Sequence, residues 1–171
     1  DSCEGATLVD LRSPLLAPFG SDASVTYTFS GLAAPNGVQP RLVIDAVSDL
    51  NTVQEYIGVA FDGSAPELFF VADGSDCPTT PDRATRVFST SEFANLTAGG
   101  QLTVVVTASG LVSSTQCAGG GIRLRLVYTT LGTGKVGGRV YAGTALDVGT
   151  LAPTGSRVPP SSTAPMSQSL P

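Results

Sequence analysis

The stretch that decides the fold is residues 122–129, Ile122-Arg123-Leu124-Arg125-Leu126-Val127-Tyr128-Thr129. Every second residue is large and apolar, and the residues between them are largely polar. A period of two predicts a β-strand that buries one face and exposes the other to water. Residues 25–30 and 102–108 repeat the alternation. The repeated pattern predicts antiparallel sheets that pack one face on the core and expose the other face to solvent.

Further short segments flank these three and carry the same strand signals. We expect strands at residues 7–11, 41–47, 56–61, 67–72, 84–89 and 136–141. Turn residues lie between them at 35–37, 62–63 and 99–100. Many short strands with such punctuation predict an all-β fold, a two-sheet antiparallel sandwich of jelly-roll type. One short helix is expected at residues 91–96, because Ser89 and Glu92 have capping-box spacing and Gly99 could end it.

The character of the chain changes after Leu131. We expect a β-sandwich domain over residues 1–131 and an extended arm rich in Gly, Pro and Ser over residues 132–171. Alone, the Pro/Ser-rich end of this arm cannot bury enough apolar surface to offset the entropy of ordering. The arm is therefore expected to pack on a neighbouring subunit, with packing on its own domain as the alternative.

The charge of the chain excludes several classes of function. The net charge is −5, only 13% of the residues are charged, and the chain has a single lysine, Lys135. The sequence contains no basic run to neutralise a phosphate backbone, which disfavours nucleic-acid binding. No apolar run is long enough to span a bilayer, so no membrane insertion is expected. A low-charge surface is common in extracellular β proteins, and we expect an extracellular or cell-surface location.

The three cysteines predict one disulfide. Cys77 and Cys117 both lie in loop-like segments, and the short Cys-x-x-Cys spacing of metal sites is missing. A Cys77–Cys117 bridge is the preferred interpretation. Cys3 is then left over, either free or available for a bond to another chain, and its pairing with Cys77 or Cys117 stays open.

Catalytic chemistry has little support in this composition. The chain has no histidine, which removes the Ser-His-Asp triad, the Cys-His pair and most zinc sites. Carboxylates remain, but a glycosidase needs two of them facing each other across a cleft, and solvated loop carboxylates are the default. We expect no enzyme and no cofactor. A structural calcium ion is a weak alternative, with Asp49, Asp73 and Asp76 as its candidate ligands.

The central part of the chain resembles a module of bacterial secreted and cell-surface proteins. The resemblance runs from Arg41 to Thr130 and is carried by residues 44–51, 55–63, 88–89 and 100–104 together with the two loop cysteines. Such modules resemble jelly-roll sandwiches of the galactose-binding type. The resemblance implies an extracellular β-sandwich and transfers no catalytic or sugar-binding residue to this chain. The arm from Gly132 onward has no counterpart in it.

These observations predict a structural subunit of an extracellular or surface assembly, such as a filament, a sheath or a coat. Its partners would be other copies of the chain, joined by strand addition through the arm and through residues 7–11. Cys3 could lock neighbours covalently. The apolar residues of the arm that would make the contact are Val136, Val140, Tyr141, Leu146, Val148 and Leu151. The alternative is a monomeric module that binds a carbohydrate or another surface polymer, so a polysaccharide is a possible partner.

Overall fold

The computed structural model describes residues 5–21 and 23–131. Cys3 and the arm at residues 132–171 lie outside the described residues, so the predictions that concern them stay predictions.

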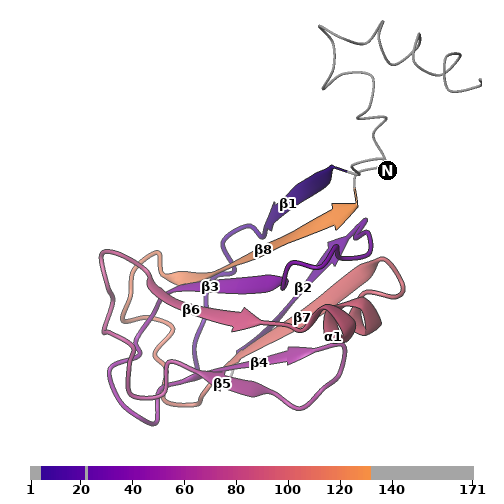
Figure 1. The fold of residues 1–171 in the computed structure, drawn as a ribbon. Coiled ribbons are helices and arrows are strands. Elements are labelled where there is room, and N and C mark those ends of the chain that lie inside the picture. The colour runs from indigo at the N-terminus through magenta and orange to yellow at the C-terminus, as the bar shows by residue number, and fades with distance from the viewer. Residues whose placement is uncertain (1–4, 22, 132–171) are drawn as a thin grey trace, which may run out of the picture. The chain divides into compact units, whose positions relative to one another are not determined.

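Eight strands and one helix make up the described fold (Figure 1). The strands are β1 (Ala6–Arg12), β2 (Ser24–Ser30), β3 (Arg41–Val47), β4 (Ile57–Phe61), β5 (Glu67–Phe69), β6 (Asp82–Val87), β7 (Gln101–Ala108) and β8 (Gly121–Leu131). The helix α1 (Thr90–Leu96) lies between β6 and β7. All strand pairs are antiparallel, which confirms the predicted all-β class.

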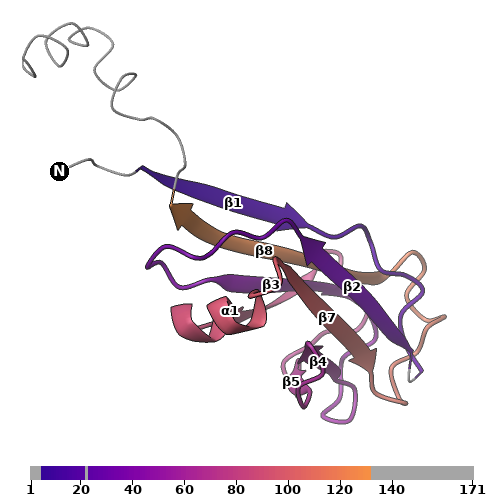
Figure 2. The same cartoon turned by 90° about the vertical axis from the view of Figure 1, so that its right-hand side faces the viewer.

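The strands form two four-stranded sheets, ordered β1-β8-β3-β6 and β2-β7-β4-β5, that pack as two layers (Figure 2). The first strand pairs with the last, the second with the seventh, the third with the sixth and the fourth with the fifth. This nested pairing is the topology of a double-sheet jelly roll. Ala6 pairs with Leu131, so both ends of the described domain lie at one corner of the first sheet.

The core lies between the two sheets and follows the alternation of the sequence. Ile122, Leu124 and Leu126 of β8 are buried, whereas Arg123 between them is exposed. The capping box of α1 is formed as predicted: Ser89 Oγ accepts a hydrogen bond from the Glu92 backbone N–H. This start directs Phe93 into the core, where its ring centroid lies 5.0 Å from that of Tyr128.

Several strand boundaries differ from the sequence prediction, and β6 covers Asp82–Val87 instead of residues 84–89. Strand β5 ends at Phe69 instead of residue 72, because Phe70 and Ala72 adopt left-handed backbone conformations with φ of 63° and 70°. Such φ values cannot continue a pleated strand. The helix ends at Leu96, the predicted last residue, with Thr97 as its C-cap, and Thr97 Oγ1 donates to the Phe93 carbonyl. Gly99 is therefore not the residue that ends the helix.

The two lateral sides of the sandwich are protected differently. On the side of β5 and β6, Arg86 of β6 donates to Glu67 of β5 at 2.8 Å and to Glu92 of α1 at 2.6 Å. An inward-pointing charge at a sheet edge disfavours pairing with another chain. On the other side β1 and β2 form the edges, and the inward side chains of β1 are Val9 and Leu11, both only partly buried.

Candidate functional site

The outer face of the first sheet carries a cluster of arginines. Arg12 on β1 lies directly opposite Arg125 on β8, and Arg123 on β8 lies opposite Asp45 on β3, which in turn faces Arg83 on β6. The alternation of each strand points these side chains outward, and the strand order β1-β8-β3-β6 places them side by side (Figure 1). The cluster therefore joins residues from four strands that are far apart in the sequence.

Two carboxylates hold part of this cluster together. Arg125 donates to both carboxylate oxygens of Asp10, at 2.8 and 2.7 Å. Arg83 donates to both oxygens of Asp45, at 2.7 and 3.1 Å. Both contacts are bidentate, the geometry in which a guanidinium group binds a carboxylate most specifically. Without them, arginines placed directly opposite one another would repel.

The pKa shifts agree with these contacts. The hydrogen bond from Arg125 lowers the pKa of Asp10 below its ordinary value of 3.8. The hydrogen bond to Asp45 raises the pKa of Arg83, and the hydrogen bond to Asp10 raises that of Arg125. Both carboxylate-bound arginines therefore keep their charge under all ordinary conditions, as arginines do in general.

These side chains surround a pocket of about 410 Å³, which we call the arginine pocket. Its lining consists of Arg12, Ser13, Pro14, Leu15, Asp45, Arg83, Arg123, Leu124 and Arg125. The volume is in the range of small-molecule sites. Within the described part of the chain, Arg123 makes no ion pair and no side-chain hydrogen bond. Its guanidinium group therefore has no charged partner among the residues that the structure describes.

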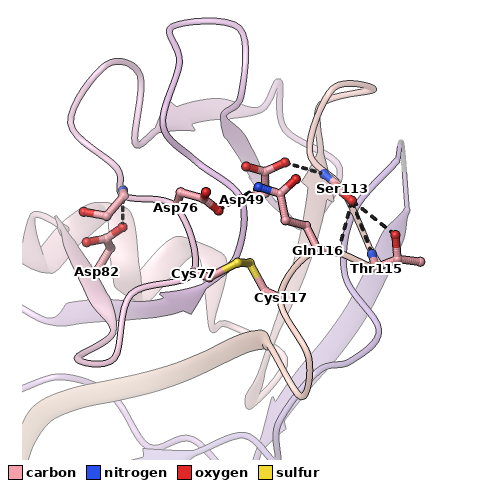
Figure 3. The surroundings of a disulfide bond; sticks show 9 residues. Asp49, Asp76, Cys77, Asp82, Ser113, Thr115, Gln116 and Cys117 are labelled. Carbon is pink, nitrogen blue, oxygen red and sulfur yellow. Dashed lines mark hydrogen bonds between the residues drawn. A yellow bond between two sulfur atoms is a disulfide. The ribbon is translucent and has the colours of Figure 1, made fainter.

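A second cluster surrounds the disulfide between Cys77 and Cys117 (Figure 3). Asp49 and Asp76 are joined there by an isolated antiparallel bridge. The Ser113 backbone N–H donates to Asp49 at 3.3 Å, and the Gln116 side-chain amide donates to Asp76 at 3.0 Å. Asp49 is only 5% exposed, and its burial, followed by the nearby charges of Glu55 and Asp76, raises its pKa. The bridge and these hydrogen bonds tie together three loops, those after β3, β5 and β7.

The structure brings together only part of the proposed calcium set. Asp49 and Asp76 are joined by the isolated bridge, whereas Asp73 belongs to no group with the spacing of metal ligands among the described residues. In the described ranges one group has the spacing of metal ligands, Asp76 with Cys77 and Cys117. Because its two sulfur atoms are already bonded to each other, they offer no thiolate to a metal. The calcium site stays a prediction.

The arginine pocket was not among the sites predicted from the sequence. A local signal existed in the Arg-Leu-Arg alternation of residues 123–125, which places two cations on one strand face. The partners Arg12 and Arg83 join them only through the strand order, which local patterning does not specify. The prediction of a Cys77–Cys117 disulfide is confirmed.

Comparison with known proteins finds no matching family model, no similar curated protein and no similar solved structure. The fold supports the β-sandwich part of the resemblance described above. A disulfide is typical of proteins that fold in an oxidising compartment. Among the described residues, no helix has the length and apolar character needed to cross a membrane.

Proposed function

We propose that this chain is a structural subunit of an extracellular or surface assembly, built by strand addition at the free edge of β1. The proposed added strand comes from the arm of a neighbouring copy, around the alternating residues Val136 and Val140. The proposal assigns the domain no catalytic role. Its main support is that β1 is an edge strand whose outer backbone groups have no partner among the described residues.

The free edge of β1 has the backbone groups that an added strand requires. The Ser13 backbone N–H donates to the Leu124 carbonyl of β8 at 2.8 Å. Because hydrogen-bonding direction alternates along an antiparallel strand, residues 9 and 11 also face β8. Leu8, Asp10 and Arg12 then direct their N–H and C=O groups away from β8, where no described residue pairs with them. Strand addition uses such a row of backbone groups.

The side chains of β1 also favour strand addition at this edge. Leu8 is 65% exposed, and Val9 and Leu11 are only partly buried although they face the core. Strand β1 contains no proline and no lysine, the residues that commonly protect an edge. An added strand would cover Val9 and Leu11. The described chain enters β1 and leaves β8 at one corner of the first sheet, where Ala6 pairs with Leu131.

The test is the mass in solution of the full chain and of three variants, measured by light scattering over a concentration series without reductant. Leu8→Lys places a charge at the proposed contact, and a version ending at Leu131 removes the arm. Leu68→Lys is the matched control, because Leu68 is 54% exposed on β5, at the protected side of the sandwich. Each lysine replaces an exposed side chain and should change the free energy of unfolding by about 0.5 kcal/mol or less.

We expect the native chain and Leu68→Lys to form large species, and Leu8→Lys and the shortened chain to be monomers. A native chain that stays monomeric at every concentration contradicts the proposal. So does a Leu8→Lys variant that assembles as well as Leu68→Lys.

A further inference from the structure

We propose that the arginine pocket binds an acidic polysaccharide through its carboxylate groups, with Arg123 and Arg12 as the main anion-binding residues. This inference does not rest on assembly, because the pocket is formed by one copy of the chain. It rests on three features of the outer face of the first sheet: its excess positive charge, the ion pairs among its side chains, and the extent of its arginine cluster.

The pocket is positive on a negative protein. The four guanidinium groups of Arg12, Arg83, Arg123 and Arg125 are balanced by only two carboxylates, those of Asp10 and Asp45. The chain as a whole has a net charge of −5. An excess of two positive charges concentrated in one hollow attracts an anion locally, whereas the rest of the protein repels it.

The excess charge resides on two residues. Asp10 and Asp45 are taken up by the bidentate contacts with Arg125 and Arg83. Arg12 reaches Asp10 only at 3.7 Å, and its side chain is 67% exposed. Arg123 is exposed and makes no ion pair within the described ranges. Among the described residues of the pocket, Arg12 and Arg123 therefore offer the most unused N–H donors, since Arg83 and Arg125 use their Nε and Nη2 groups on the two carboxylates.

We assign the ligand anion as a carboxylate by analogy with the two carboxylates that the pocket arginines already bind. The carboxylates of Asp10 and Asp45 each accept two hydrogen bonds from one guanidinium group, that of Arg125 and that of Arg83. The N–O distances are 2.7 to 3.1 Å. A ligand carboxylate on Arg123 or Arg12 would repeat this geometry. Guanidinium forks bind planar carboxylates with two parallel hydrogen bonds.

The extent of the cluster favours a polymer over a small ion. The four arginines lie on β1, β8 and β6, and the strand order makes the distance between β1 and β6 three strand spacings, about 14 Å. A single small anion can contact only part of such a row. The pocket lining contains no aromatic ring on which a nucleic-acid base could stack, and Pro14 and Leu15 offer small apolar surfaces to the C–H groups of a sugar. A chain of acidic sugars fits this combination.

The experiment is a calorimetric titration of the full-length protein with trigalacturonate, a short oligomer that carries one carboxylate per sugar. Arg123→Gln removes the charge but keeps an unbranched stem with a polar, uncharged end. Arg41→Gln is the matched control, because Arg41 is an exposed outward residue of β3 in the same sheet and does not line the pocket. The melting temperature of each variant verifies that it is folded.

We expect the native protein and Arg41→Gln to bind trigalacturonate equally, with affinity that falls as salt is added. Arg123→Gln should bind about ten- to a hundredfold more weakly, the range expected for losing a charge-assisted hydrogen bond. The methyl-esterified oligomer, which lacks the charge, should not bind.

Three results would overturn the proposal: no binding by the native protein, equal binding by both arginine variants, or tighter binding of a sulfated sugar oligomer or a short single-stranded oligonucleotide than of trigalacturonate.

Discussion

The disulfide should account for a large part of the stability of this domain. Cys77 and Cys117 are 40 residues apart, and the bond joins the loop before β6 to the loop before β8. Closing a loop of that length lowers the entropy of the unfolded chain by about 13 cal/mol/K, which is about 4 kcal/mol at 25 °C. The double variant Cys77→Ser, Cys117→Ser should lose about this much free energy of unfolding. Both cysteines are only partly buried, so serine meets little packing cost.

The assay is unfolding in urea, followed by circular dichroism in the absence of reductant. With a denaturant slope of about 2 kcal/mol/M, a loss of 4 kcal/mol lowers the midpoint by about 2 M. Cys3→Ser is the control and should leave the midpoint unchanged, because that residue takes no part in the bond. A double variant that unfolds within about 0.5 M of the native protein would refute the loop-closure argument. Two free thiols at Cys77 and Cys117 in the oxidised native protein would refute the bond itself.

Two further changes test the interior. Burial raises the pKa of Asp49 above 3.8, so the folded protein is favoured while this carboxyl is protonated, and that stability is lost as the pH rises through the raised value. The free energy of unfolding of Asp49→Asn should therefore rise relative to that of the native protein as the pH is raised from 3.5 to 7, as measured by urea titrations. A difference between the two proteins that stays constant over this range would contradict the raised pKa of Asp49. Phe93→Ala removes a fully buried ring that packs on Phe88 and Tyr128, and should cost about 3–5 kcal/mol in the same assay, whereas Leu96→Ala, which is only partly buried, should cost less.

Local signals in the sequence located the described strands to within a few residues, and they located the start of the helix. The alternation over residues 122–129 fixes which side chains of β8 enter the core, because the side-chain period of a strand is two. The Ser89–Glu92 spacing likewise fixes the start of α1, since both hydrogen bonds of the capping box are local. The predicted end of β5 lies too far along the chain because Phe70 and Ala72 adopt left-handed conformations. Neither residue type favours that conformation, so the sequence does not signal it.

The arginine pocket could not be predicted in the same way. Its members belong to β1, β3, β6 and β8 and to the loop after β1, and their proximity depends on which strands are neighbours and in which register. A shift of one residue in the pairing of β1 with β8 would no longer place Arg12 opposite Arg125. That register is set by the burial of Val9 and Leu11 against the rest of the core, a long-range property that appears only in the folded domain.

The two proposed surfaces make different physical demands on β1 and are compatible with each other. Strand addition uses backbone groups that point along the plane of the sheet, whereas the arginine pocket uses side chains that point out of that plane. Arg12 can therefore face a ligand while its own backbone pairs with another strand. If copies of the chain assemble through β1, the positive pockets repeat along the assembly, and a long acidic polymer could contact several at once. Multivalent contact of this kind strengthens binding without any new interaction in the single pocket. A modest affinity of one pocket for one short oligomer is then what a surface assembly attached to an acidic polymer would need.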